Sequence, residues 1–230
     1  MGVRSRCPPS ARGGALRRGR PANGPLPALV RSLLQPDQPR PAMSTPPNSD
    51  AAARYGVVSR LFHWLTALLI FLMIPAGIAM TSEGFDEISD TIFVFHKGTG
   101  TVLLVLVVLR LGWRFTHSPP SPPPGMTALQ ARLADWTHTF LYLLLLVMTV
   151  SGYVRVVGDG FPIELLDWLG IPTLLPEMPE LAQRMSVVHK FTAYLFTATI
   201  AAHIAAAIHH GISKGDGILG RMWPPIGGDR

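Results

Sequence analysis

The chain has almost no cysteine: the single Cys7 lies far from every long apolar segment. One thiol excludes an intramolecular disulfide and an iron–sulfur cluster held by several cysteines. It also excludes the Cys-x-x-Cys-His motif that attaches haem covalently. Any metal or haem site in this protein must therefore use other side chains.

Charged residues are also scarce, at 15% of the 230 residues, whereas 48% are hydrophobic and the mean hydropathy is +0.30. This composition is typical of a small polytopic membrane protein. The net charge of +6 does not indicate a nucleic-acid binder, because residues 1–42 hold eight arginines against one aspartate, a net charge of +7. The remainder, from Met43 onward, has a net charge of −1.

Residues 1–53 are predicted to form a disordered tail rich in arginine and proline. The first 42 residues contain no apolar run of the length that a secretory signal needs. Met43 begins the sequence Met-Ser-Thr-Pro-Pro, so we expect translation to start there. The alternative is an arginine-rich arm that binds anionic lipid. The folded domain is expected over residues 54–224, with a short tail over 225–230.

Four long apolar segments follow the tail. Each reaches the roughly 20 residues that an α-helix needs to cross about 30 Å of hydrocarbon. The runs are continuous, whereas the strands of a membrane β-barrel alternate. The sequence therefore predicts an all-α fold, a polytopic membrane four-helix bundle, with spans at about 57–80, 91–115, 136–157 and 187–210.

The loops differ in charge, which predicts the orientation in the membrane. Lysine and arginine gather before the first span, between the second and third, and after the fourth, whereas the loops 81–90 and 158–185 are acidic overall. By the positive-inside rule both termini are expected in the cytoplasm. The cytoplasmic linker contains a stiff proline-rich stretch, 118–125. In the second outer loop, residues 161–169 are predicted to form a short interfacial helix anchored by Trp168, or else a plain connector.

Five histidines lie inside or at the edges of the apolar segments. Ionisable side chains at membrane depth are costly, so they indicate a functional site, and metal ligation is the expected role for neutral imidazole. Three further histidines, at positions 117, 209 and 210, are expected to be solvated. The five are His63, His96, His138, His189 and His203.

Four of these histidines fall at two matched depths. Because helix directions alternate, His63 and His203 share a level near the cytoplasmic face, and His96 and His189 share a level near the outer face. His189 and His203 are 14 residues apart, about 40° short of four whole turns, so both imidazoles point into the bundle. They lie roughly 21 Å apart along the axis. Two pairs at two depths are what two bis-histidine haems would require.

Small residues one turn from these histidines provide room for two cofactors, although such residues also serve ordinary helix contacts. They are Gly100, Ala193, Ala206 and Ala207.

Three cations lie next to the outer histidines: Lys97, Lys190 and Arg184. They are candidate partners for haem propionates, or charges that steer a small anion to the outer face. The alternative is that they are ordinary interface residues whose charged ends reach water.

His138 is predicted to open the third helix on the cytoplasmic side. It is a candidate alternative ligand at the level of His63 and His203, or a hydrogen-bond partner for a quinone carbonyl near that site. The alternative is an ordinary polar residue at a helix end.

The histidine-bearing segments together match a known pattern, which covers about residues 54–224. The sequence is similar to the prokaryotic cytochrome b561 family. The matching segments are Ser59-Arg-Leu-Phe-His-Trp64, His96-Lys-Gly-Thr-Gly100, His138-Thr-Phe-Leu-Tyr142 and, in the last span, Val188-His-Lys190 with His203-Ile-Ala-Ala-Ala-Ile-His-His210.

The resemblance implies a bacterial inner-membrane oxidoreductase with two non-covalent b haems. One haem would be ligated by His63 with His203 and the other by His96 with His189. It also implies electron transfer between membrane quinone and a donor or acceptor at the periplasmic face. In some members the donor is superoxide and the acceptor is ubiquinone.

Three alternatives to a stand-alone oxidoreductase remain open, the first of them implied by the resemblance. Similar cytochrome b subunits serve separate dehydrogenases, with the acidic loops or the proline-rich linker as docking surfaces. A metal-ion transporter would use the intramembrane histidines as a relay, but the spans lack clear midplane carboxylates. A structural bundle would give the histidines no chemical role.

Overall fold

The computed structural model describes residues 54–123, 125–214 and 217–224. The predictions for the tails 1–53 and 225–230 lie outside the described residues. The chain separates into two units, Met1–Pro47 and Asn48–Arg230, and the second contains all of the described structure. Across these described ranges every regular element is helical and none is a strand. The predicted all-α fold is confirmed.

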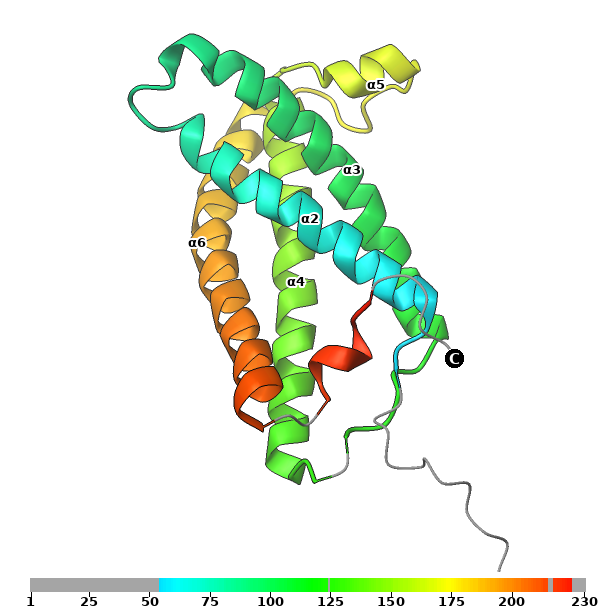
Figure 1. Ribbon diagram of the computed structural model, residues 1–230. Coiled ribbons are helices and arrows are strands. Elements are labelled where there is room, and N and C mark those ends of the chain that lie inside the picture. The colour runs from blue at the N-terminus through cyan, green and yellow to red at the C-terminus, as the bar shows by residue number, and fades with distance from the viewer. Residues whose placement is uncertain (1–53, 124, 215–216, 225–230) are drawn as a thin grey trace, which may run out of the picture. The chain divides into compact units, whose positions relative to one another are not determined.

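Four long helices make up the bundle (Figure 1). Short helical elements precede α3, connect α4 to α6 and follow α6. The long helices are α2 (Val57–Ala79), α3 (Ser89–Thr116), α4 (Ala128–Gly158) and α6 (Pro179–His209); the short ones are η1 (Asp86–Ile88), α5 (Glu164–Leu169), the π-helical η2 (His210–Lys214) and η3 (Leu219–Arg221).

Each long helix is long and apolar enough to cross a membrane, with mean hydropathies between 1.6 and 2.1 over the best window. Only 6% of that window is buried in α2 and in α6. Apolar side chains that face outward in such numbers require lipid around them. The prediction of four spans is confirmed, and the chain is a multi-pass membrane protein.

The helices pack in a definite order. The most extensive contact joins α4 and α6, followed by α2 with α3 and α3 with α4, whereas α6 makes few close backbone contacts with α2 or α3. One apolar core lies among α3, α4 and α6, around Val107 and Phe196. A second core joins the end of α4 to α5.

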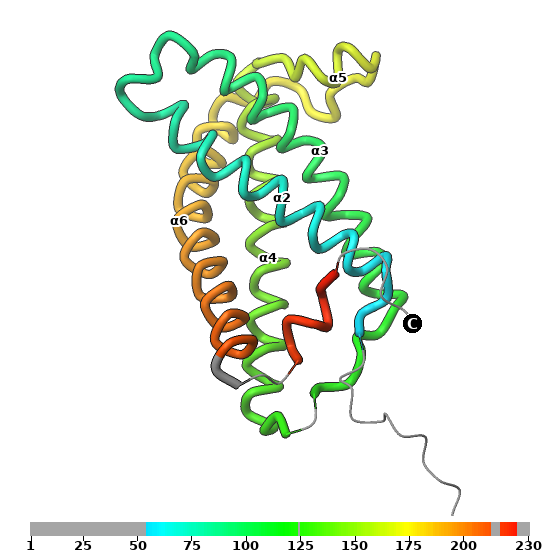
Figure 2. Tube along the Cα trace, viewed as in Figure 1, coloured from blue at the N-terminus to red at the C-terminus, as the bar shows by residue number. Residues whose placement is uncertain are grey.

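The two ends of the bundle carry different segments, as Figures 1 and 2 show. We call them the α5 end, where α5 and the loop between α2 and α3 lie, and the C-terminal end, where the segment 217–224 and the linker between α3 and α4 lie.

Two helices begin earlier than their apolar segments suggested. The third span was predicted from Trp136, but α4 begins at Ala128 because Thr127 and Gln130 form a capping box, in which the Gln130 amide donates to Thr127 Oγ1 and the Thr127 amide donates to Gln130 Oε1. α6 begins at Pro179, a residue suited to the first turn. The prediction that His138 opens its helix is therefore wrong: His138 lies nearly three turns inside α4.

The segment predicted as an interfacial helix or connector does form a helix, α5. Ile163 and Leu166 bury their side chains under it, and Gly170 ends it at a positive φ of 65°. Trp168 is 81% exposed. This exposure fits the predicted role of Trp168 as an interfacial anchor, which stays a prediction.

The segment 217–224 makes hydrogen bonds with two other parts of the C-terminal end. Arg221 is buried and donates to the carbonyls of Pro120 and Ser121 at 3.2 and 2.7 Å. Trp64 Nε1 donates to the Met222 carbonyl at 2.8 Å, and Arg54 donates to Trp223. The segment thus ties the start of α2 to the linker between α3 and α4.

Candidate functional site

Four histidines form two pairs, one toward each end of the bundle. In the α5-end pair, the rings of His96 on α3 and His189 on α6 have centroids 6.3 Å apart. In the C-terminal-end pair, His63 on α2 and His203 on α6 have ring centroids 6.4 Å apart. Each pair bridges two helices that make few close backbone contacts with each other.

The two spacings agree with axial ligation of one metal by two imidazoles. A metal–imidazole nitrogen distance of about 2.0 Å, plus about 1.1 Å from nitrogen to ring centre, places two opposed ring centroids roughly 6.2 Å apart. The ring planes are inclined at 77° and 71°. Two imidazole rings that face each other across one metal can be rotated by any angle about the line that joins their ligating nitrogens. The two inclinations therefore also agree with ligation of one metal.

The α5-end pair sits against two glycines. A Cβ at Gly152 would lie 2.9 Å from His189 Cε1, and one at Gly77 would lie 3.2 Å from His96 Cε1. Any larger residue at Gly152 would displace the imidazole. These glycines therefore give the two rings the space in which they face each other.

Hydrogen bonds define which nitrogen of His189 is available. His189 Nδ1 lies 3.0 Å from the Met148 carbonyl, which only accepts, so Nδ1 carries the proton and Nε2 keeps its lone pair. Ser151 Oγ lies 3.3 Å from the same nitrogen. His96 Nδ1 is buried and has no hydrogen-bond partner among the described residues. Both features leave this pair suited to ligating a metal.

The C-terminal-end pair lies beside arginine. Arg110 Nη2 is 3.3 Å from His63 Nδ1, and Arg110 Nε donates to the Tyr142 hydroxyl at 3.2 Å. Its guanidinium also lies over the Tyr142 ring, 5.0 Å from the centroid. Arg60 is fully buried one turn before His63. Sequence reasoning did not connect Arg110 with His63, because their contact depends on how α2 and α3 pack.

His138 also approaches this pair, with its ring centroid 5.5 Å from that of His203. That spacing is shorter than two opposed axial imidazoles require, whereas the 6.4 Å between His63 and His203 fits. The geometry therefore favours His63 over His138 as the partner of His203. His138 stays a neighbour of the site.

The three cations expected near the outer histidines divide into two kinds. Lys190 and Arg184 are exposed on α6. The Lys97 side chain is 4% exposed, and its Nζ lies 2.7 Å from Glu164 Oε1. Lys97 is therefore already paired with a carboxylate on α5, and its role in steering an anion or binding a propionate stays a prediction.

A different cation, Arg155, lies near the α5-end pair. It lies on α4 one turn after Ser151, whose hydroxyl is 3.3 Å from His189 Nδ1. Arg155 also lines an open cavity of about 450 Å³ between α4 and α6. Gln183 and Ser186 line the same cavity and add hydrogen-bond donors, and the carboxylates Asp159 and Glu180 line it as well. Sequence reasoning missed Arg155, because α4 and α6 meet only in the fold.

That small residues leave room for two cofactors stays a prediction. Gly100 does not face a histidine, since a Cβ there would lie 3.4 Å from Met73 Cε on α2. The glycines that do touch the imidazoles, Gly77 and Gly152, come from neighbouring helices and were not predicted.

The remaining histidines lie apart from both pairs. His117 is exposed and stacks on Trp113 at 3.5 Å, and His209 is exposed at the end of α6. Within the described ranges no three His, Cys, Asp or Glu side chains gather into a cage for a metal ion. Two facing histidines suit an axially ligated haem, whereas an all-protein metal site needs more ligands.

Comparison with known proteins agrees with this geometry. Residues 54–225 match the family model described as prokaryotic cytochrome b561. The chain is 32% identical to cytochrome b561 homolog 2 of Escherichia coli (strain K12) over 170 residues, 74% of this chain and 90% of that protein. It is 27% identical to cytochrome b561 homolog 1 of the same organism over 174 residues, 74% of this chain and 97% of that protein. The family implies haem b binding and electron transfer. The chain, with its four membrane-spanning helices and its facing histidines, belongs to the prokaryotic cytochrome b561 family.

Proposed function

We propose that this protein is a di-haem cytochrome b that carries electrons between membrane quinone and a donor or acceptor at the periplasmic face of the bacterial inner membrane. The observation that supports it most is the presence of two histidine pairs with axial spacing, 6.3 and 6.4 Å between ring centroids. His189 and His203 are 14 residues apart on α6, which separates the two sites by roughly 21 Å along the helix. Two sites, one near each end of the bundle, would provide a path for electrons across the membrane.

In this proposal the α5-end pair, His96 and His189, holds one haem b and the C-terminal-end pair, His63 and His203, holds the other. Each haem, when bound, supplies a one-electron redox centre at its iron. The four histidines would hold the two haems in place, and each pair would supply both protein ligands of its iron. Substrates would therefore exchange electrons at the porphyrin edge and would not need to bind iron.

The arginines near each pair are suited to the haem carboxylates. A histidine that ligates through Nε2 carries its proton on Nδ1, so Arg110, which only donates, cannot keep its contact with His63 Nδ1 in that state. Its guanidinium would then donate to a propionate, which accepts two parallel hydrogen bonds well. Arg155 would do so at the α5-end pair, next to the two carboxylates, Asp159 and Glu180, that line the same cavity.

The orientation follows from the positive-inside rule: the α5 end faces the periplasm, and both termini face the cytoplasm. Exposed Lys190 and Arg184 then lie on the periplasmic side and would attract a small anion. Superoxide is the anion that we propose as donor, with ubiquinone as acceptor. Two superoxide anions give up one electron each and become O₂, and ubiquinone takes up two electrons and two protons.

The first experiment is a haem count with reduced-minus-oxidised spectra on the purified full-length chain. Wild type is expected to hold two b haems. His96→Ala and His189→Ala should remove or alter one, and His63→Ala and His203→Ala the other. His117→Ala, a histidine outside both pairs, should leave both haems unchanged.

Other outcomes would overturn specific parts of the proposal. One haem that is indifferent to His96 and His189 would remove the second site. Bound zinc without haem would favour a metal-ion transporter. Copurification of a dehydrogenase that reduces the haems would replace superoxide with a docked protein donor, as in the cytochrome b subunits of larger complexes.

A further inference from the structure

The short helix α5 is attached to α3 directly beside a proposed haem ligand. A Cβ at Gly98 would lie 3.7 Å from Leu165 Cβ, so the two helices approach closely at this point. Leu166 and Ile163 anchor α5 in the apolar core that it shares with the end of α4. Gly98 lies two residues after His96. Movement of α5 would therefore shift this part of α3 and with it the position of His96.

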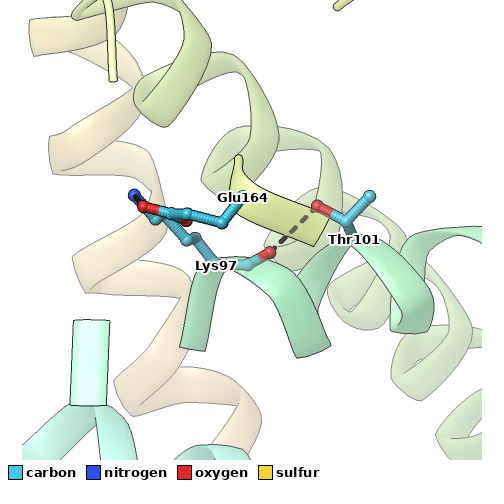
Figure 3. A network of polar contacts seen from close by, with 3 residues as sticks. All are labelled: Lys97, Thr101 and Glu164. Carbon is cyan, nitrogen blue, oxygen red and sulfur yellow. Dashed lines mark hydrogen bonds and ion pairs between the residues drawn. The ribbon is translucent and has the colours of Figure 1, made fainter. Parts of the chain in front are cut away.

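A polar contact completes this attachment, as Figure 3 shows. The Lys97 ammonium lies 2.7 Å from Glu164 Oε1, and the side chains are 4% and 45% exposed. The ammonium also lies over the Phe93 ring, 4.9 Å from its centroid. Thr101 Oγ1 donates to the Lys97 carbonyl at 2.9 Å, within α3. Lys97 is thus directed to α5 and away from water.

Charge compensation gives this contact a consequence for the neighbouring site. A buried ammonium is costly unless a counter-charge accompanies it. Lys97 directly follows His96 in α3, so the two side chains start from the same turn of the helix. Charges and hydrogen bonds around a haem set its reduction potential. A neutral Lys97–Glu164 pair and an uncompensated Lys97 would therefore act differently on the iron that His96 would ligate.

We propose that Glu164 is a positioning residue for the α5-end haem: its carboxylate holds the Lys97 ammonium on α5 and neutralises it beside His96. The pair thereby keeps the reduction potential of this haem below the value that a lone buried cation would give. Glu164 touches neither the proposed ligands nor a substrate, and it acts through Lys97. This inference rests on the proposed di-haem function.

The test is a potentiometric titration of the full-length protein with both haems bound. The α5-end haem is identified as the one that His96→Ala removes. Glu164→Gln should raise the midpoint potential of this haem. The reduced iron carries one positive charge less than the oxidised iron, so an uncompensated Lys97 ammonium favours the reduced form. Glu164→Asp, which keeps the carboxylate, should remain near wild type. Asp167→Asn, an exposed carboxylate on the same helix, is the matched control and should have no effect.

The double variant Lys97→Met with Glu164→Gln separates charge from packing. If Glu164 acts by neutralising Lys97, the second change removes the cation and returns the potential toward the wild-type value, because neither charge remains. Hydrogen exchange of residues 164–169 reports whether α5 has loosened. Equal potential shifts in Glu164→Gln and Lys97→Met, both with faster exchange, would mean that packing alone is responsible and would overturn the proposal.

The two proposals fail in different ways. Two haems in wild type, with a potential that Glu164→Gln leaves unchanged, would overturn the role of Glu164 and leave the di-haem function intact. Absence of the α5-end haem from wild type would overturn the di-haem function itself.

Discussion

His189 on α6 lies against Gly152 on α4, so closely that a Cβ on the glycine would be 2.9 Å from His189 Cε1 and 3.1 Å from its Nδ1. The imidazole thus occupies the space that any other residue at position 152 would fill. The same ring donates to Met148 on the preceding turn of α4. α4 therefore sets both the position and the tautomer of a proposed haem ligand that belongs to another helix.

Gly152→Ala is expected to displace His189 and to weaken binding of the α5-end haem while leaving the other haem in place. Overpacking of this kind costs about 1–3 kcal/mol. The readouts are haem content and thermal unfolding in detergent. Gly112→Ala is the control, because a Cβ there meets nothing within 4 Å, and its effect should stay within about 1 kcal/mol. Normal haem content in Gly152→Ala would contradict the role of Gly152 in leaving space for the His189 ring.

Arg110→Gln is expected to weaken binding of the C-terminal-end haem about tenfold, the lower part of the range for groups that support metal ligands. Loss of the cation should also lower the midpoint potential of this haem, because the oxidised iron loses a nearby repulsive charge. Titration of haem into the apoprotein and potentiometry measure the two effects. Arg114→Gln, an exposed arginine one turn further along α3, should change neither.

Replacement of Lys190 and Arg184 by glutamine is expected to lower the second-order rate of haem reduction by superoxide about two- to tenfold and to reduce its salt dependence. The reason is that both cations are exposed at the α5 end. Stopped-flow reduction at several ionic strengths provides the measurement. Arg132→Gln, an exposed arginine on α4 near the opposite end, is the control. Unchanged rates would remove these two residues from the steering role.

The Lys97–Glu164 contact is expected to depend on pH. Burial alone would raise the pKa of the Glu164 carboxyl, but its hydrogen bond to Lys97, a backbone hydrogen bond and the Lys97 charge outweigh burial and lower the pKa below its ordinary value of 4.5. Because the folded pKa is lowered, the stabilisation is present above about pH 4.5 and is lost as pH falls through the folded pKa. The difference in thermal stability between wild type and Glu164→Gln should therefore be constant near neutral pH and shrink in acid. A difference that grows in acid would contradict this sign.

Arg221→Ala is expected to destabilise the C-terminal end by about 1–3 kcal/mol, because the carbonyls of Pro120 and Ser121 lose their buried donor. Thermal unfolding and limited proteolysis of the linker between α3 and α4 would report the loss. Arg132→Ala, at an exposed position, should stay within about 0.5 kcal/mol of wild type. Equal stability of the two variants would show that the segment 217–224 contributes nothing to the bundle.

The sequence by itself determined the four spans and the histidine levels. Continuous apolar runs of membrane length have only one economical solution, a helix, because backbone groups in lipid must be satisfied within the segment. The 14-residue spacing of His189 and His203 then follows from helical periodicity alone. The early start of α4 could also have been predicted from the capping pair Thr127 and Gln130, but the span was predicted from the apolar run alone.

Only the tertiary structure decided what surrounds the histidines. The contacts of His189 with Gly152, of Arg110 with His63 and of Lys97 with Glu164 all join different helices, and each depends on the rotation and offset of one helix against the other. A hydropathy pattern fixes neither, because in lipid every face of an apolar helix is equally acceptable. The sequence therefore specified the histidines and their depths, and the packing of the helices specified the residues that act on them.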